Sequence, residues 1–496
     1  MAQNNDNCSK GVYRKLSKKS RELLGDVYSN IYNYRSIELP DLQEIFQPEA
    51  IDYLLGPKFN GSFVDLLIEA GYKDVPKVDE NGEPILRRTT ALHDYANKYA
   101  VSHIDTWIRK LFKIYARFDV NYADKFGITH FHLACEYGCV DEVKKFLEVG
   151  QDPNYLTNKG VSPLIFALSD PKVFELLLRA GANPNSGGMT PLHHICQGDN
   201  NDDLAKMIFE LSNEKYRPVQ VNTRDKLGNA PLYYALMHSH DDLVELLLKN
   251  GADPNLANEK GLRPLHITLK KIWCTCNDGT DVKYLLEMFF KINKELDQPV
   301  QVDARDDLGR TPLEYAVARL LPEAVDVLLD HGADLSSFVF PPASHFREMS
   351  MMNHEIKNYQ LRIATGLLAV VESLEKRGYE LDRKAALTIR SLFAKYGLID
   401  SSSILPKYWY EENTFKSEAK SLTIVPNLSV YDWILMRPEE ASKRLAYSDY
   451  YRFARRNDFK YIPDEVYEAY VVHMGEKISK VFFARVLRND RQASDE

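Results

Sequence analysis

One short motif occurs seven times between residues 90 and 335 of this 496-residue chain. Its fullest form reads Gly-x-Thr-Pro-Leu-His-x-Ala, and it is followed by a second apolar segment that ends Leu-Leu-x-x-Gly-Ala-Asp. Pro231 and Pro264 occupy the same motif position and lie 33 residues apart (264 − 231 = 33), whereas other spacings differ through short insertions or a deletion. A period of this length predicts a solenoid, because each repeat can bury its apolar face only against its neighbours. The copies begin at Thr90, Gly127, Gly160, Gly188, Gly228, Gly261 and Gly309.

Each residue type in the motif has a local mechanical role. Thr190 precedes Pro191, so the hydroxyl can cap a helix whose first turn tolerates the missing N–H of proline. Leu247 and its apolar neighbours are predicted to fill the seam between adjacent repeats. Each repeat is therefore predicted to be a helix-turn-helix unit with a β-hairpin tip, within an all-α repeat solenoid. The glycines that suit a left-handed helix end are Gly71, Gly150, Gly181, Gly251 and Gly332.

This motif resembles the ankyrin repeat. The resemblance implies seven ankyrin repeats over residues 90–337, with the hairpin tips and first helices lining a concave face that binds a target protein. It also implies that the histidine of the Thr-Pro-Leu-His position bonds to backbone near the next hairpin, and has no catalytic or metal-binding role. The histidines in that position are His93, His132, His193 and His266.

The regions on either side of the repeats have different patterns. The apolar segment at 63–72 has the form of a second repeat helix without a first half, which suits an N-terminal cap. Apolar residues recur at helical spacing from 356 to 374, and a second helix is predicted to follow an Asp382 cap. The predicted regions are a polar, basic and partly disordered arm (1–45), a capping half-repeat with a hairpin extension (46–89), a connector and helical capping hairpin (338–400), a small helical C-terminal domain (401–490) and a tail (491–496).

Composition excludes several classes of function. A net charge of −8 gives no global basic field, so nucleic acid is not expected as a partner. No apolar run approaches the roughly eighteen residues that a membrane span needs, so no membrane association is expected. Six cysteines in so long a chain do not form a disulfide framework. The sequence contains no phosphate loop, nucleophile elbow or paired catalytic carboxylates, so neither enzyme activity nor a cofactor is predicted.

Two clusters have competing interpretations. His132, Cys135 and Cys139 could share one helical face as zinc ligands, but the other copies of the motif lack the cysteines, which favours ordinary core positions. The basic cluster at 14–21 could be a nuclear-import signal, although a solvated tail explains it more simply. A cytoplasmic location is expected, with nuclear import left open.

The C-terminal region resembles the PRANC module of ankyrin proteins from poxviruses, ants and parasitoid wasps, through residues 428–434, 449–451 and 476–483. In the poxvirus members this module is related to a truncated F-box that docks on Skp1, the adaptor of a cullin ubiquitin ligase. The resemblance implies a comparable docking helix near 462–466, where proline suits the first helical turn. The alternative is that the same apolar residues are ordinary core. The adaptor-docking candidates are Ile462, Pro463, Glu465, Val466, Tyr470 and Met474.

The sequence predicts a protein-binding chain in one of two forms. It is either an adaptor that presents a target to a ubiquitin ligase, or a scaffold or competitive inhibitor without ligase coupling. Exposed apolar residues such as Phe126 and Tyr137 are the predicted anchors, because aromatic side chains commonly dominate binding. The candidate positions on the concave face are Lys125, Phe126, Ile128, Glu136, Tyr137, Lys226, Leu227, Asn229, Met237, His238, Asp307, Leu308 and Arg310.

Overall fold

The computed structural model forms two compact units, Met1–Lys226 and Leu227–Glu496. The described residues are 48–57, 62–97, 103–198, 202–270, 280–346, 359–399, 409–456 and 462–495. The basic cluster at 14–21 and three of the six cysteines (Cys8, Cys274 and Cys276) lie outside them. None of the described helices combines the length and the apolar character needed to cross a lipid bilayer.

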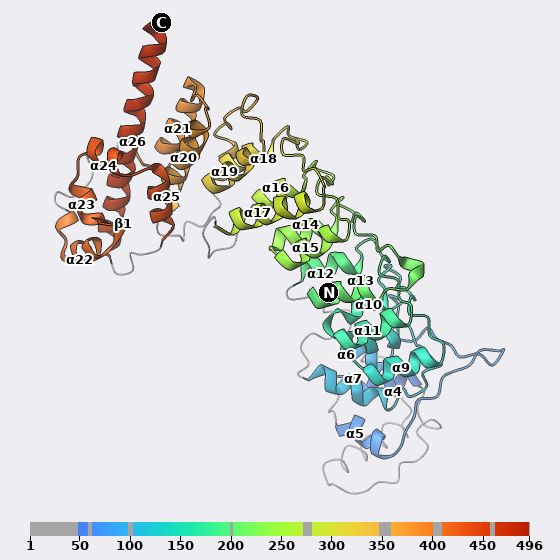
Figure 1. The fold of residues 1–496 in the computed structure, drawn as a ribbon. Helices are drawn as coiled ribbons and strands as arrows, with labels where there is room; N and C mark the ends of the chain where they lie inside the picture. Colours follow the sequence, from blue (N-terminus) through green and yellow to red (C-terminus); the bar gives the residue numbers. More distant parts are fainter. Residues whose placement is uncertain are drawn as a thin grey trace. The chain divides into compact units, whose positions relative to one another are not determined.

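Paired helices recur in both units, which confirms the predicted helical repeat fold (Figure 1). The pairs of the first unit are α6 (Ala91–Ala96) with α7 (Ile104–Phe112), α8 (His130–Glu136) with α9 (Val140–Glu148), α10 (Pro163–Phe166) and the short 3-10 helix η1 (Ala167–Ser169) with α11 (Pro171–Arg179), and α12 (Pro191–Gln197) with α13 (Asp202–Leu211), after which η2 (Glu214–Tyr216) follows. The pairs of the second unit are α14 (Pro231–His238) with α15 (Asp241–Lys249), α16 (Pro264–Lys270) with α17 (Thr280–Glu295), and α18 (Pro312–Ala318) with α19 (Pro322–Asp330).

The ends of these helices follow from the residues of the motif. The Thr311 hydroxyl accepts a hydrogen bond from the backbone N–H of Glu314 (3.3 Å), which caps α18 after a proline-containing first turn. Gly251 and Gly332 have φ angles of 91° and 90°, a left-handed conformation that ends α15 and α19 and that glycine adopts without strain. The same conformation at Gly71, Gly150 and Gly181 confirms the predicted helix ends there.

The core of each repeat lies between its own helices and those of the next repeat. In the second unit, α15 packs against α14 and α17, and the side chain of Leu247 is fully buried there. Leu243, Val244 and Leu248 are buried on the same face of α15. This seam supplies the apolar burial that a single repeat cannot provide.

Two helices precede the first repeat: α4 (Pro48–Leu55) and α5 (Ser62–Glu69). α4 contacts α6, and α5 contacts α7. A hairpin then extends from this region, with an antiparallel bridge between Val78 and Pro84 and a hydrogen bond from Ile85 N to Lys77 O (2.8 Å). These helices cover the outer side of the first pair, as a solenoid cap must.

Helices continue after the last repeat in the second unit. They are α20 (Tyr359–Lys376), α21 (Arg383–Lys395), η5 (Trp409–Glu411), α22 (Asn413–Ser421), α23 (Val430–Leu435), α24 (Pro438–Arg444), α25 (Tyr447–Arg455) and α26 (Asp464–Asp495). The strands β1 (Thr423–Val425) and β2 (Leu428–Ser429) form a short antiparallel ribbon between α22 and α23. Asp382, predicted as a cap, accepts a hydrogen bond from Ala385 N (2.6 Å) at the start of α21.

The C-terminal helices share a core with the hairpin that follows the repeats. α20 packs against α19 on one side and against α25 and α26 on the other. The guanidinium of Arg362 donates to the carbonyl oxygens of Ala454 (3.3 Å) and Arg455 (2.9 Å). A carboxylate oxygen of Glu372 accepts from the backbone N–H of Ser448 (2.9 Å). The chain therefore has the predicted helical C-terminal region after the solenoid, and α20 of the capping hairpin packs against two of its helices.

Half of the predicted docking residues are buried in the structure. Ile462, Tyr470 and Met474 are buried inside the C-terminal region of this chain. The Tyr470 ring lies 5.8 Å from that of Phe415, and its hydroxyl lies 3.3 Å from the sulfur of Met474. An apolar face that already packs against its own chain cannot enter a partner's groove, so these three residues are core. Pro463 and Glu465 are exposed and Val466 is partly exposed.

Candidate partner-binding surface

A tight turn presents Phe126 at the hairpin tip that precedes α8. The carboxylate of Asp124 accepts hydrogen bonds from the backbone N–H groups of Phe126 (2.8 Å) and Ile128 (2.9 Å). Gly127 has a φ of 75°, and a Cβ at this position would lie 2.6 Å from the side-chain oxygen of Asn158 in the next hairpin. The turn therefore requires glycine at 127 and holds the backbone of Phe126 rigid.

The Phe126 side chain is 43% exposed at this tip. The Nζ atoms of Lys125 and Lys159 lie 4.9 Å and 6.0 Å from the centre of its ring. Its carbonyl accepts from Asn158 N (3.0 Å), which ties the tip to the following hairpin. A large apolar side chain is thus held partly in solvent by a fixed backbone.

The second unit repeats this arrangement with leucine. Leu227 is 61% exposed and Leu308 is 74% exposed, each at a hairpin tip. The Asp306 carboxylate accepts from the backbone N–H groups of Leu308 (3.0 Å) and Arg310 (2.8 Å), as Asp124 does in the first unit. Lys226, Asp307 and His238 are also exposed, whereas Met237 and Arg310 are partly buried.

Asn229 is the one predicted surface position that the structure buries. Its side-chain oxygen accepts a hydrogen bond from Asn258 (2.9 Å), and its amide nitrogen lies 3.4 Å from the Tyr234 hydroxyl. The prediction that Asn229 is a free contact residue is wrong, because its amide links two hairpins.

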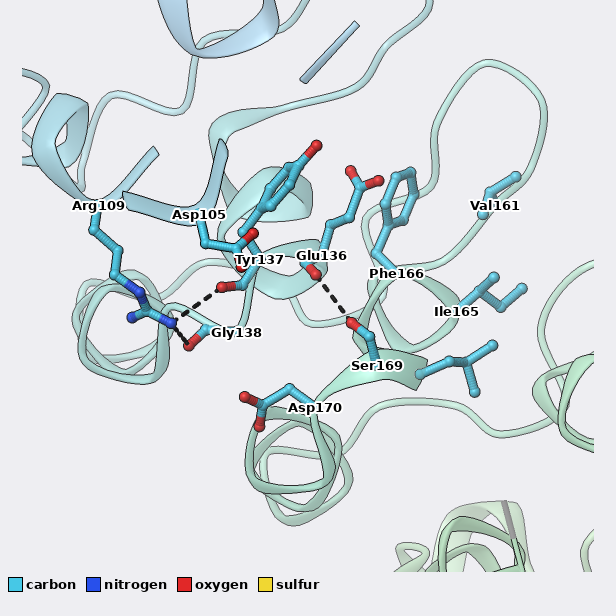
Figure 2. Close-up of a pocket in the computed structure, with 11 residues that line it drawn as sticks. Asp105, Arg109, Glu136, Tyr137, Gly138, Val161, Ile165, Phe166, Ser169 and Asp170 are labelled. Atoms are coloured by element: carbon cyan, nitrogen blue, oxygen red, sulfur yellow. Dashed lines mark hydrogen bonds between the residues drawn. The ribbon is translucent and has the colours of Figure 1, made fainter. Parts of the chain in front are cut away.

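In the first unit, Glu136 and Tyr137 line an open groove of about 710 Å³. In Figure 2, the Glu136 side chain projects between the rings of Tyr137 and Phe166. Leucine, isoleucine and valine side chains from the following repeat complete the apolar part of the lining. The full lining is Asp105, Arg109, Glu136, Tyr137, Gly138, Val161, Ile165, Phe166, Leu168, Ser169 and Asp170.

Hydrogen bonds from neighbouring repeats fix the backbone of this groove. Arg109 of α7 donates to the carbonyl oxygens of Tyr137 (3.2 Å) and Gly138 (2.8 Å). From the other side, the Ser169 hydroxyl donates to the carbonyl of Glu136 (3.0 Å) (Figure 2). Three consecutive helix pairs therefore contribute to one site. The turn after α8 is hydrogen-bonded to α7 of the preceding pair, and the end of α8 is hydrogen-bonded to η1 of the following pair.

Three carboxylates and one guanidinium border the groove, which leaves a formal charge of −2 (1 − 3 = −2). The Asp170 carboxylate accepts from the backbone N–H groups of Lys172 (2.9 Å) and Val173 (3.1 Å), so it caps α11. Asp105 and Glu136 are exposed, and neither forms an ion pair within the described part of the chain. The negative charge at this edge is therefore available to a ligand.

Comparisons with known proteins agree with this geometry. A family model for ankyrin repeats matches residues 98–187, 169–258 and 251–338. The probable 26S proteasome regulatory subunit p28 of Saccharomyces cerevisiae is 30% identical over 159 residues, which covers 30% of this chain and 67% of p28. The chain belongs to the ankyrin-repeat family. Its ankyrin repeats are a protein-interaction module.

Two further matches each cover less than half of this chain. Neurogenic locus notch homolog protein 1 of Mus musculus is 33% identical over 153 residues, which is 30% of this chain but only 6% of the Notch protein. The solved ankyrin repeat domain of Bcl-3 is 25% identical, with 43% of this chain and 90% of that chain covered and a TM-score of 0.36. The chain thus spans only a small part of the Notch protein.

The histidines of the ankyrin motif bridge successive repeats. In His132, Nδ1 accepts from the backbone N–H of Thr129 (3.1 Å), so Nε2 carries the proton and donates to the carbonyl of Tyr155 (2.9 Å). His93 bonds to Ile128 O (2.9 Å) and His266 to Arg310 O (3.1 Å) in the same way. The implied backbone role is confirmed for these three positions.

Burial keeps these histidines neutral. It lowers the pKa values of His93, His132 and His266 to about 4 in each case. Burial also raises the pKa of the Cys135 thiol well above its usual range, and both Cys135 and Cys139 are buried free thiols. Within the described residues, no three His, Cys, Asp or Glu side chains come together as metal ligands.

A buried ionic cluster in the N-terminal cap was not predicted from the sequence. Arg88 Nε donates to Asp52 (2.7 Å), and Arg88 Nη1 donates to Asp74 (3.0 Å). Tyr122 also donates to Asp74 (2.7 Å), and its ring centre lies 4.9 Å from the guanidinium carbon. Burial raises the pKa of Asp52 to about 6, although the charge of Arg88 acts to lower it. No motif marks these residues, because Asp52, Asp74 and Arg88 lie before the repeats and meet Tyr122 only in the packed structure.

Proposed function

We propose that this chain is a binding scaffold whose ankyrin hairpin tips and adjoining groove hold a target protein. The observation that carries this proposal is the repeated exposure of one large apolar side chain at a rigid tip: Phe126 in the first unit, and Leu227 and Leu308 in the second. By contrast, the apolar side chains of the core between repeats, such as Leu247, are buried. Exposed apolar side chains on a fixed backbone are typical of protein-binding anchors.

The groove at Tyr137 provides the second part of this surface in the first unit. Its backbone is held by Arg109 and Ser169, so little conformational entropy is lost when a partner binds. The Tyr137 side chain is partly exposed, and its ring presents an apolar surface to a ligand. Binding to a preformed surface is the role that this geometry supports best.

Alanine substitution at Phe126 and Tyr137 tests this function. The double variant should bind the natural target at least tenfold more weakly, since buried aromatic anchors contribute about 2 kcal/mol or more. Lys144→Ala on the exposed face of α9 is the matched control and should leave the affinity unchanged. If the double variant keeps its helical signal and binds within twofold of wild type, this surface is not the binding site.

Coupling to a ubiquitin ligase is a separate proposal that rests on the PRANC resemblance. Because Tyr470 and Met474 are buried, only Pro463, Glu465 and Val466 of the candidate docking residues near this helix remain accessible to Skp1. The alternative is a scaffold or competitive inhibitor that binds its target without an adaptor. Purified Skp1, tested for binding to the full chain and to a Glu465→Lys variant, separates the two. We place either activity in the cytoplasm.

A further inference from the structure

We infer that the groove at Tyr137 takes a basic, apolar segment of the target protein, in which lysine or arginine residues flank an aliphatic side chain. This inference rests on the proposed function and adds the chemistry of the partner. It follows from three properties of the groove: apolar side chains in its lining, an excess of carboxylates over cations, and an open form.

The apolar side chains of the groove are fixed in position. The rings of Tyr137 and Phe166 stand on either side of the Glu136 side chain, and Ile165 lies beside Phe166 on α10 (Figure 2). The Phe166 ring lies 5.0 Å from that of His132, which is itself hydrogen-bonded to Tyr155 O. An aliphatic side chain could bury itself here without first displacing a protein side chain.

The edge of the groove selects positive charge. The Arg109 guanidinium donates to the carbonyls of Tyr137 and Gly138 and keeps its positive charge, so the three carboxylates leave the groove a net formal charge of −2. Asp105 and Glu136 remain exposed, with no ion pair to any described residue. A lysine or arginine beside the aliphatic anchor would meet these carboxylates, whereas an acidic segment would be repelled.

The form of the groove suits a polypeptide segment. Its volume of about 710 Å³ is open to solvent along the ends of α8 and α10, and its walls come from three helix pairs. Small molecules are generally held in enclosed pockets that cover most of their surface. An extended segment can lie along an open groove and place several side chains in it at once.

The test uses the full chain and a short fluorescent peptide in which lysines and arginines flank leucines. Binding is measured by fluorescence anisotropy. Two further peptides are compared with it, one with glutamates in place of the basic residues and one with serines in place of the leucines. We expect both to bind at least fivefold more weakly, and binding of the basic peptide to weaken as salt rises from about 50 mM to about 300 mM.

Charge removal on the protein provides the matched comparison. Glu136→Gln combined with Asp105→Asn should weaken binding of the basic peptide about fivefold, since exposed charge pairs have modest energies. Asp203→Asn combined with Glu210→Gln removes the same charge from exposed positions on α13, and should change the affinity less than twofold. Equal effects of the two double variants, or equal binding of basic and acidic peptides, would overturn the inference.

Two results would overturn this inference without overturning the proposed function. If the target needs Phe126 and Tyr137 but the basic peptide neither binds nor competes with it, the groove chemistry is wrong and the scaffold function stands. The second result comes from a variant of the full chain in which glutamine replaces the basic residues of the N-terminal arm. These residues are Arg14, Lys15, Lys18, Lys19 and Arg21. If the basic peptide binds only to that form, the occupant is the chain's own basic arm and the assignment to a partner is overturned.

Discussion

His132 and the carbonyl of Tyr155 are joined by a hydrogen bond of 2.9 Å that connects one ankyrin repeat to the hairpin of the next. The two hydrogen bonds of the ring together require a neutral imidazole, because Nδ1 must be unprotonated to accept the backbone N–H of Thr129 (3.1 Å). Burial lowers the pKa of His132 to about 4, below its ordinary value of 6.5. The ring that positions this hairpin is therefore also a site at which acid destabilises the fold.

This relationship predicts the pH dependence of stability. Between pH 6.5 and pH 4 the unfolded chain binds a proton at His132 that the folded chain does not, so stability falls as the pH falls through this window. His132→Gln keeps a donor and an acceptor but does not titrate. The difference in unfolding free energy between wild type and this variant should shrink by about 2 kcal/mol from pH 7 to pH 4.5. Urea unfolding at both pH values measures it, and a constant difference would contradict the neutral buried imidazole.

Leu247 should be essential to the seam between repeats. Leu247→Ala removes a fully buried side chain and should destabilise the second unit by about 2–5 kcal/mol. Leu227→Ala is the matched control at an exposed tip of the same repeat, and should change stability by less than about 0.5 kcal/mol. Chemical unfolding followed by circular dichroism compares them. Equal effects would mean that the repeat register is wrong.

Arg88 should be far more important to stability than a surface arginine. Arg88→Met leaves the buried carboxylates of Asp52 and Asp74 without their partner, which should cost about 3–5 kcal/mol at pH 7. Arg179→Met breaks only the exposed pair with Glu175 and should cost less than about 1 kcal/mol. The Arg88→Met loss should be smaller at pH 5, because burial raises the pKa of Asp52 to about 6 and its protonation removes an unpaired charge. Urea midpoints that are equal for the two variants at pH 7 would contradict the ionic cluster.

The start and the middle of α26 should respond differently to the same charge. Met474→Asp places a carboxylate in the C-terminal core and should unfold that region, which limited proteolysis after Lys395 would detect. Val466→Asp introduces a carboxylate at a partly exposed position in the first turn, where the helix dipole favours it, and should leave the fold intact. If Val466→Asp is folded and still captures Skp1 as well as wild type, adaptor docking at this residue is ruled out. Unfolding by Val466→Asp would contradict the burial assigned to it here.

Local rules in the sequence predicted the repeats and several of their surface residues. Glycine and proline positions defined the helix ends, and the hairpin turn placed Phe126, Leu227 and Leu308 in solvent as predicted. Asn229 occupies a position equivalent to Ile128 in the motif, yet its amide is buried against Asn258. The position of a residue in a repeat therefore predicts where its backbone lies, but the chemistry of its side chain determines whether that side chain is exposed or buried.

Features that combine distant segments could not be predicted. The groove joins Asp105, Tyr137 and Phe166 from three helix pairs, and no local pattern relates them. On α26, the spacing of Tyr470 and Met474 indicates one apolar face but not what covers it. Only the packed structure shows that this face is covered by the chain itself.

The central claim is that a target protein binds at the hairpin tips and the groove of the ankyrin repeats. Site-specific cross-linking tests it most directly, with a photoreactive phenylalanine analogue placed in the full chain at position 126, at position 137, or at position 144 on the exposed face of α9. The three preparations are irradiated with the target present, and the yield and position of each cross-link are read by mass spectrometry. We predict cross-links to the target from positions 126 and 137 and none above background from position 144. Cross-links from position 144 alone, or equal yields from all three positions, would contradict the claim.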